Sequence, residues 1–178
     1  MHKDCERILF TEKQLSERIE EVALEVNKRY ENKNPIVVGI LKGSVLFCAD
    51  FVRRLHADVE LDFMAVSSYG SGTVSSGKLK IKKDLDRDIK GRDIIIVEDI
   101  IDSGFTMANL KALLLEMGAK SVIIVTLLDK KERREYDIHP DYNCFEIGNE
   151  FVIGYGLDYD EKYRTLPYIA VLKKSVYE

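Results

Sequence analysis

The segment IIIVEDIIDSGFT, residues 94–106, brings carboxylates, hydroxyls and a glycine together directly after an apolar run. Its polar side chains and its glycine are Glu98, Asp99, Asp102, Ser103, Gly104 and Thr106. Carboxylates accept hydrogen bonds from sugar hydroxyls, whereas free backbone N–H groups at the start of a helix suit a phosphate. Hydroxyl side chains add donors, and a glycine lets the backbone turn closely around an anion. The segment therefore predicts a sugar-phosphate site, although acidic residues that end a strand can also be solvated and inert.

A strand, a turn and a helix must position these side chains. Residues 93–99 have the apolar character of a buried strand, residues 102–106 form a polar loop, and a helix with leucines at helical spacing follows until Gly118 can end it. Residues 121–128 are the next buried strand, so the whole is a right-handed βαβ unit. Because ligands of open α/β sheets bind beyond the carboxyl ends of the strands, the polar loop lies where a site is expected.

The rest of the chain shows the same alternation of helices and strands. Thr11 and Gln14 have capping-box spacing, which predicts a helix over about residues 12–30. Further strands are predicted at 36–41, 59–66, 79–81, 143–147, 151–155 and 169–172, and an apolar helix from 45 to about 55. We expect an α/β fold with a mostly parallel central sheet flanked by helices, in one domain over residues 1–178.

Residues 67–77, SSYGSGTVSSG, contain five serines and three glycines. This composition is typical of a flexible linker, but the flanking strands belong together and no second core follows, so we interpret the segment as a mobile flap. Residues 72–78 also spell most of a phosphate-binding P-loop. Leu79 stands where that motif needs a hydroxyl side chain, and a strand pattern follows instead of a helix, so we reject a P-loop.

Composition limits the function classes. Lys and Arg number 27 and Asp and Glu 31, which gives a formal charge of −4 and no overall field for nucleic acid or an anionic membrane. Three widely spaced cysteines and three scattered histidines indicate neither a disulfide framework nor a zinc site, and favour a reducing compartment. We see no signal peptide and no run of about 18 apolar residues, so we expect a cytoplasmic protein with no membrane and no nucleic-acid partner.

The segment 94–106 closely resembles the phosphoribosyl pyrophosphate-binding motif of the purine phosphoribosyltransferases. Other motifs of that family follow in the right order: Leu41-Lys42-Gly43 resembles its pyrophosphate loop, Ser67-Ser68-Tyr69-Gly70 its flap, Leu128-Asp129-Lys130 its base-recognition lysine, Glu150-Phe151-Val152 its base-stacking segment, and residues 155–159, 163–164 and 166–169 complete the set. The resemblance runs over residues about 7–173 and points to the bacterial hypoxanthine (hypoxanthine-guanine) type.

This resemblance implies a type I phosphoribosyltransferase fold with a small hood and a mobile flap. The implied reaction moves 5-phosphoribosyl from phosphoribosyl pyrophosphate to N9 of hypoxanthine, and of guanine, which gives IMP or GMP in purine salvage. Implied partners are these small molecules and further copies of the chain in a homo-oligomer, a dimer or a tetramer. The implied cofactor is Mg²⁺.

The resemblance also assigns roles to residues. The phosphoribosyl pyrophosphate or nucleotide would be bound by Lys42, Gly43, Glu98, Asp99, Ile101, Asp102, Ser103, Gly104, Phe105, Thr106 and Arg164. The purine would be bound by Lys130, Phe151, Val152 and Asp158, the flap would contribute Ser68 and Tyr69, and the metal ligands would be Glu98, Asp99 and Asp158.

Asp102 would be the general base that takes the proton from N7 of the purine. Lys130 would set the substrate class, because an ammonium group only donates and therefore pairs with a 6-carbonyl rather than a 6-amino group. Phe105 stands where relatives often carry a basic or amide side chain, so phosphate affinity would rest more on backbone donors. The Leu41–Lys42 peptide bond can be cis in this family.

Two other function classes remain as alternatives. A nucleotide-sensing, RNA-binding regulator on the same fold would need a basic face, for which the lysine-rich stretch 78–83 is short. A sugar-nucleotide-binding or flavin-binding Rossmann-like protein would need a G-x-G-x-x-G turn after its first strand, which the sequence lacks. The preference among hypoxanthine, guanine and xanthine stays open.

Overall fold

The central sheet of the computed structural model, which describes residues 1–56, 58–68 and 79–177, has six strands in the order β4-β3-β2-β5-β6-β7. These are β2 (Ile36–Leu41), β3 (Glu60–Ser68), β4 (Leu79–Lys83), β5 (Asp93–Ile101), β6 (Ser121–Asp129) and β7 (Tyr142–Glu146). Strands β3, β2, β5, β6 and β7 pair in parallel, in this order across the sheet. Strand β4 pairs with β3 in antiparallel fashion and forms the edge of the sheet. The predicted mostly parallel sheet is thus confirmed.

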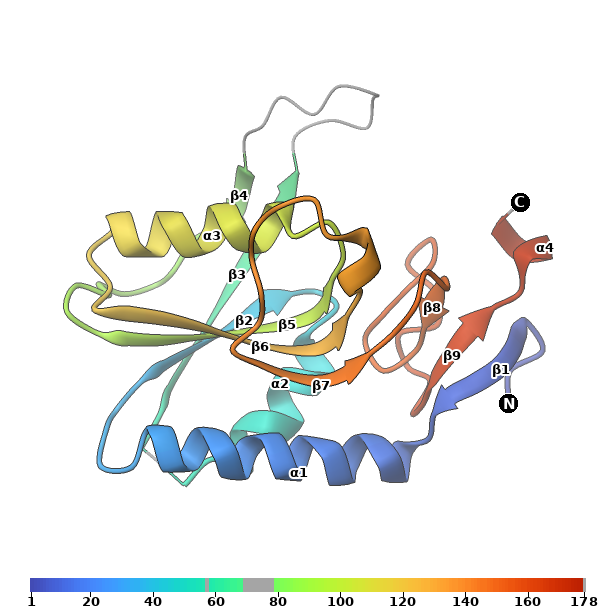
Figure 1. Cartoon of the computed structure of the whole chain (residues 1–178), viewed down its shortest axis with the longest axis horizontal. Helices are drawn as coiled ribbons and strands as arrows, with labels where there is room; N and C mark the ends of the chain where they lie inside the picture. Colours follow the sequence, from blue (N-terminus) through green and yellow to red (C-terminus); the bar gives the residue numbers. More distant parts are fainter. Residues whose placement is uncertain (57, 69–78, 178) are drawn as a thin grey trace.

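Helices cover both faces of this sheet (Figure 1). Helices α1 (Glu12–Arg29) and α2 (Val45–Val52) lie on one face, and α3 (Phe105–Glu116) lies on the other. The capping box that predicted the start of α1 is present, since Gln14 N–H donates to the Thr11 hydroxyl and the Gln14 side chain accepts from Thr11 N–H. The βαβ unit from β5 through α3 to β6 is also confirmed.

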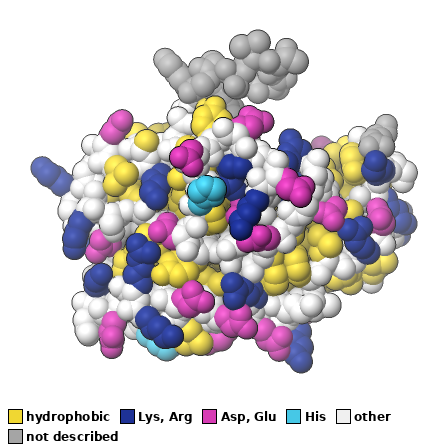
Figure 2. Space-filling view, viewed as in Figure 1, with side chains coloured by type: hydrophobic (Ala, Val, Ile, Leu, Met, Phe, Trp, Pro, Cys, Tyr) yellow, Lys and Arg dark blue, Asp and Glu magenta, His cyan; other side chains and the backbone are white. Residues whose placement is uncertain are grey.

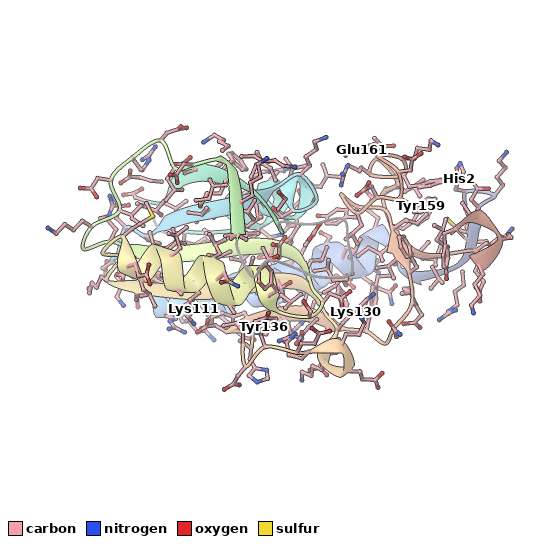
Figure 3. All side chains as sticks on the ribbon, turned by 90° about the horizontal axis from the view of Figure 1, so that it is seen from above. His2, Lys111, Lys130, Tyr136, Tyr159 and Glu161 are labelled. Atoms are coloured by element: carbon pink, nitrogen blue, oxygen red, sulfur yellow. The ribbon has the colours of Figure 1, made fainter. Side chains whose placement is uncertain are left out.

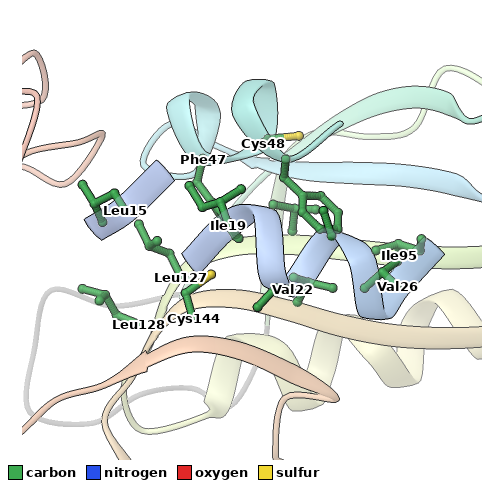
Figure 4. Packing of buried hydrophobic residues seen from close by; sticks show 14 of the residues in the cluster. Leu15, Ile19, Val22, Val26, Phe47, Cys48, Ile95, Leu127, Leu128 and Cys144 are labelled. Atoms are coloured by element: carbon green, nitrogen blue, oxygen red, sulfur yellow. The ribbon is translucent and has the colours of Figure 1, made fainter. Parts of the chain in front are cut away.

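Two apolar cores fill the layers. Leu15, Ile19 and Val22 of α1 pack with Phe47 of α2 against the sheet, as Figure 4 shows. On the other face, the side chains of α3 pack on alternate residues of the same strands, for example Ile94 and Ile96 of β5. Because β5 is buried on both faces, its sequence is a continuous apolar run rather than an alternating one. The core holds the end of β5 rigidly, and the polar segment begins there.

A second, three-stranded antiparallel sheet forms the hood, with the order β1-β9-β8. Its strands are β1 (Cys5–Phe10), β8 (Val152–Ile153) and β9 (Ile169–Leu172), and it has a small core of its own. The hood lies beyond the carboxyl ends of β6 and β7, together with both ends of the described chain (Figure 1). The region between sheet and hood is therefore bounded on two sides.

Several element boundaries differ from the predictions. Strand β5 continues two residues further, to Ile101, and α3 already begins at Phe105, so Phe105 and Thr106 lie in its first turn rather than in a loop. The predicted strand 151–155 shrinks to Val152–Ile153, because the chain takes positive φ angles from Gly154 to Gly156. Three short elements were not predicted: β1, the 3₁₀ helix η1 (Lys131–Arg133) and α4 (Lys174–Tyr177).

The end of α3 confirms the prediction for Gly118, which has φ +93° and donates its N–H to Leu115 O. The predicted flap falls mostly outside the described residues: Ser68 ends β3, and Tyr69 belongs to the part not described. Lys, Arg, Asp and Glu side chains are interspersed on the face shown in Figure 2. None of the helices in the described part of the chain is long and apolar enough to cross a membrane.

Candidate active site

A cavity of about 340 Å³ opens at the carboxyl ends of β2 and β5, in front of the first turn of α3. Twelve of the residues singled out from the sequence line it: Lys42, Gly43, Glu98, Asp99, Ile101, Asp102, Ser103, Gly104, Phe105, Thr106, Asp158 and Arg164. They come from three separate stretches of sequence, and the parallel sheet brings the first two together, since β2 and β5 are neighbours. The structure therefore places the candidate sugar-phosphate and pyrophosphate residues around one space.

The turn after β2 is packed tightly on both sides. Its Leu41–Lys42 peptide bond is cis, as the resemblance implied. A β-carbon on Gly43 would lie 1.5 Å from Oδ2 of Asp99, and a β-carbon on Gly156 would lie 2.0 Å from the carbonyl oxygen of Gly43. Gly156 also has φ +100°, which favours glycine. The turn is thus held between the carboxylate at the end of β5 and the chain that leads to Asp158.

Cationic and anionic side chains alternate at one side of the cavity. The Nζ of Lys42 lies 3.1 Å from Oε2 of Glu161, and Nη2 of Arg164 lies 3.3 Å from the same oxygen. Nη1 of Arg164 lies 3.0 Å from Oδ1 of Asp158 and donates to Gly156 O at 2.8 Å. Nε of Arg164 is buried and has no hydrogen-bond partner among the described residues. Two cations with a spare buried donor suit a multiply charged anion such as pyrophosphate.

Glu98 and Asp99 form a pair of adjacent, largely buried carboxyls. Burial, reinforced by the neighbouring Asp99, raises the pKa of Glu98 well above its usual value; burial also raises the pKa of Asp99, against a hydrogen bond with Glu98 and the positive charge of Arg164. A divalent cation would remove this cost, and oxygen ligands suit Mg²⁺.

The described residues contain no group of three His, Cys, Asp or Glu side chains that could hold a metal by themselves. Mg²⁺ typically uses one or two carboxylates and completes its shell with water and substrate phosphates. The Glu98–Asp99 pair fits that mode. The carboxylate of Asp158 already contacts Arg164 and accepts the N–H of Glu161 at 2.9 Å.

The turn between β5 and α3 has the features expected of a phosphate site. Gly104 is the N-terminal flanking residue of α3 and has φ +87°. The hydroxyl of Ser103 accepts the N–H of Phe105 at 3.4 Å, and the first turn of a helix leaves further backbone N–H groups without helical partners. The Phe105 ring itself packs edge-on against Tyr136. The donors that this turn offers to a phosphate are therefore backbone N–H groups and hydroxyls.

Asp102 has a cationic neighbour that the sequence did not point out. The Nε of Arg133 lies 2.8 Å from Oδ1 of Asp102, and the two side chains are about half exposed. Arg134, the next residue, donates from Nε to the backbone oxygen of Asp102. Both arginines belong to a run of charges, KKERRE, and no local pattern distinguishes them from a solvated surface.

Of the predicted purine-binding residues, Asp158 lines this cavity, whereas Lys130, Phe151 and Val152 are not among its lining residues. Lys130 follows β6 directly and is 7% exposed, and its N–H donates to Ile101 O. Burial lowers the pKa of Lys130, while Asp102 and Glu150 oppose that shift. In Figure 3, Lys130 lies on one side and Glu161 on the other of the sheet end that faces the hood.

Phe151 and Val152 belong to the hood. Val152 is buried in β8, whereas Phe151 is 37% exposed. The Phe151 ring stacks on Tyr177 of α4, with centroids 5.0 Å apart, and meets Tyr159 edge-on. The structure thus leaves the Phe151 ring partly accessible, and its role as a base stacker stays a prediction.

Comparison with known proteins gives consistent results. The family model "Phosphoribosyl transferase domain" matches residues 8–160. The bifunctional protein TilS/HprT of Listeria monocytogenes is 51% identical over 177 residues, 99% of this chain, and the chain spans 27% of that protein's length. The hypoxanthine-guanine phosphoribosyltransferase of Streptococcus pneumoniae is 51% identical over 177 residues, which are 99% of this chain and 98% of that protein. A hypoxanthine phosphoribosyltransferase structure from Staphylococcus aureus has a TM-score of 0.96 at 44% identity, with 100% of this chain and 97% of that chain covered.

Proposed function

The chain belongs to the phosphoribosyltransferase family, and we propose that it transfers 5-phosphoribosyl from phosphoribosyl pyrophosphate to N9 of hypoxanthine, and also of guanine. The products would be IMP or GMP and pyrophosphate, which makes the reaction a step of purine salvage. The observation that carries this proposal is that one cavity is lined by the N-terminus of α3, by the carboxyl pair Glu98 and Asp99, and by the cations Lys42 and Arg164. Those three groups match the 5-phosphate, the ribose hydroxyls and the pyrophosphate of one substrate.

The mechanism follows from where charge develops. When the bond between C1 of the ribose and the pyrophosphate oxygen breaks, the ring becomes positive and the leaving group becomes more negative. Lys42 and Arg164 stabilise the leaving group, and Glu98 and Asp99 hold the ribose hydroxyls. Asp102 accepts the proton from N7 while N9 of the purine forms the new bond to C1.

Glu98 and Asp99 would hold Mg²⁺ together with water and substrate oxygens, and Asp158, which contacts Arg164 in this structure, would be a further ligand; the ion would supply positive charge for the pyrophosphate oxygens. The raised pKa values of the buried pair Glu98 and Asp99 support this assignment, because a cation would favour their charged forms. A flap that includes Ser68 and Tyr69 is proposed to exclude water, which would otherwise hydrolyse the activated sugar.

Lys130 is proposed to select 6-oxopurines. Its side chain is nearly buried, which strengthens an interaction with a carbonyl group and makes a mismatched amino group costly. Phe151 would stack on the face of the purine. Val152 and Asp158 would meet an edge of the purine other than the 6-carbonyl that Lys130 contacts. The alternative, an RNA-binding regulator, would need a basic surface, whereas the face in Figure 2 carries mixed charges.

We further propose that the chain forms one domain, works in the cytoplasm and forms a homo-oligomer, a dimer or a tetramer. The three cysteines Cys5, Cys48 and Cys144 are buried free thiols, which suits a reducing compartment. Val45 and Leu46 at the start of α2 are 37% and 38% exposed and would suit a contact between copies. Light scattering at several protein concentrations would measure the number of copies.

The test of the proposed function is a spectrophotometric assay with phosphoribosyl pyrophosphate and Mg²⁺, in which hypoxanthine, guanine, xanthine and adenine are offered separately. Nucleotide formed from hypoxanthine or guanine, and none from adenine, is the expected result. If no base is converted while phosphoribosyl pyrophosphate still binds tightly, the enzyme proposal fails and the regulator takes its place.

A further inference from the structure

Arg134 lies buried behind the candidate site and joins two of its parts. Its side chain is 9% exposed and forms an ion pair with Asp129, the fully buried last residue of β6. Its guanidinium also donates to the backbone oxygen of Ile138 and, from Nε at 3.2 Å, to the backbone oxygen of Asp102. One side chain therefore contacts the ends of both β5 and β6.

The stem of Arg134 packs directly on the proposed phosphate turn. A β-carbon on Gly104 would lie 2.7 Å from Cδ of Arg134, so the turn approaches that side chain as closely as a glycine allows. The residues that follow Arg134 hold the same turn, because Glu135 N–H and Tyr136 N–H donate to Ser103 O at 2.9 and 3.1 Å. The segment after Lys130 thus supports the phosphate turn from the outside.

Asp129 connects this support to the purine side. It pairs in register with Ile101, and the N–H of the next residue, Lys130, donates to Ile101 O at 3.0 Å. The second carboxylate oxygen of Asp129, Oδ2, is buried with no hydrogen-bond partner among the described residues. A buried carboxylate with one free oxygen is costly unless a cation compensates it, and Arg134 is the cation that contacts it.

We propose that Arg134 is a positioning residue for the reaction: it holds the backbone of Asp102 and the strand end that carries Lys130 in one fixed arrangement. The inference rests on the proposed function, since it assumes that Asp102 is the general base and Lys130 the base-recognition group. Arg134 touches no substrate in this account. Arginine suits the task because its planar group spreads five donors over three nitrogens in a rigid fork. The three donors of lysine share one nitrogen, which cannot reach three acceptors that lie around a guanidinium group.

The experiment compares Arg134→Met and Arg134→Lys in the otherwise natural chain and in the Asp102→Asn variant. The kcat and the KM of each substrate are measured, together with the melting temperature. In the natural background Arg134→Met should lower kcat by about 10- to 100-fold, because a displacement of about 1 Å of a reacting group can cost that much, and should change the KM of phosphoribosyl pyrophosphate by less than about threefold. Arg134→Lys should lose less than Arg134→Met.

The decisive comparison is the loss of kcat that the Arg134 replacement causes in the Asp102→Asn variant. If Arg134 acts through Asp102, its replacement should cost less than about threefold once Asp102 is already Asn, because groups that act as a unit are not additive. Equal losses in both backgrounds would mean that Arg134 does not act through Asp102, and would overturn the inference. Lys131→Met is the matched control, since Lys131 lies in the same segment and pairs with Glu146 on the surface; its kcat should stay within about twofold.

Asp129→Asn keeps the test open if Arg134→Met does not fold, because the amide keeps the shape of the carboxyl and removes its charge. This variant should show the same dependence on the Asp102 background. A natural chain that forms no nucleotide would overturn the proposed function and the inference together. An active natural chain with background-independent losses would overturn the inference alone.

Discussion

Gly43 lies against the carboxylate of Asp99, so closely that a β-carbon on Gly43 would come within 1.5 Å of Oδ2 and 2.6 Å of Cγ. Gly43 lies in the turn directly after β2, and Asp99 lies near the carboxyl end of the neighbouring parallel strand β5. A side chain at position 43 would therefore displace one of the two carboxyls that the proposal assigns to the ribose and the metal.

Gly43→Ala should raise the KM of phosphoribosyl pyrophosphate by about tenfold or more, because the Asp99 carboxylate must move out of the position where it meets the substrate. Steady-state kinetics with that substrate varied would measure the change. Gly148→Ala is the control: a β-carbon there would meet only the end of the flexible Glu150 side chain, at 3.1 Å. Equal KM values for both variants would contradict the role of the Gly43–Asp99 contact.

Asp102→Asn should slow turnover by about 10²- to 10⁴-fold and leave the affinity for phosphoribosyl pyrophosphate nearly unchanged. Asparagine keeps the shape of aspartate, but it cannot accept the N7 proton. Calorimetric titration of the substrate and the turnover assay would separate the two effects. Undiminished turnover would remove Asp102 as the general base.

Lys130→Ala should abolish the use of 6-oxopurines or relax discrimination against adenine, which a site of this kind can set at up to about 10⁴–10⁵-fold. The reason is that the replaced ammonium group is the proposed donor to the 6-carbonyl. The ratio of kcat/KM for hypoxanthine and adenine measures the change. Lys131→Ala, one residue further and 57% exposed, should leave the ratio as it is. An unchanged ratio in Lys130→Ala would show that the residue is misassigned.

Tyr177→Ala should raise the KM of hypoxanthine several-fold, because the loss of the ring contact that supports Phe151 should cost about 1 kcal/mol of binding free energy. The KM of phosphoribosyl pyrophosphate should stay unchanged. The Tyr177 ring stacks on Phe151 at 5.0 Å with an interplanar angle of 26°, so it holds the orientation of the proposed base stacker. Tyr177→Phe keeps the ring and serves as the control. If both KM values rise together, α4 supports the hood in general rather than the purine site.

The environment of the Asp62 carboxylate predicts that the free energy of unfolding depends on pH in the acidic range. Burial alone would raise the pKa of Asp62, but backbone N–H groups of Asp86 and Phe63 and the ammonium group of Lys83 outweigh it and hold the pKa below its ordinary value of 3.8. A lowered folded-state pKa stabilises the folded state above the unfolded-state pKa, and this contribution is lost as the pH falls through the folded-state pKa.

Asp62→Asn should therefore lower the free energy of unfolding by about 1–3 kcal/mol at neutral pH, because the amide replaces an acceptor by a donor that faces an N–H group. The difference from the natural chain should begin to shrink as the pH falls below 3.8, and should be lost as the pH passes through the lower folded-state pKa of Asp62. Urea unfolding at a series of pH values would measure it. A difference that does not depend on pH would mean that the carboxylate charge does not contribute.

The strand and helix predictions that succeeded rested on local patterns. The capping box at Thr11 and Gln14, the apolar run before Glu98 and the terminating Gly118 each depend on residues within one element, and the structure has all three elements. Strand β1 was missed because its partner, β9, lies more than 150 residues away, and its own residues alternate too weakly to predict a strand.

The sequence by itself determined that the Lys42–Gly43 segment and the segment 98–106 lie at the carboxyl ends of parallel strands, because each follows or ends an apolar strand run. The position of Asp158 and Arg164 at the same cavity depends on the tertiary structure. Only the tertiary structure decided which side chains hold those motifs in place. Arg134 and Asp129, the ion pair of Arg133 with Asp102, and the shared contact of Lys42 and Arg164 with Glu161 all join residues whose types look like solvated surface charges. Their partners are set by the packing of distant segments, and the burial of the Arg134–Asp129 pair, which strengthens that interaction, is a property of the folded chain alone.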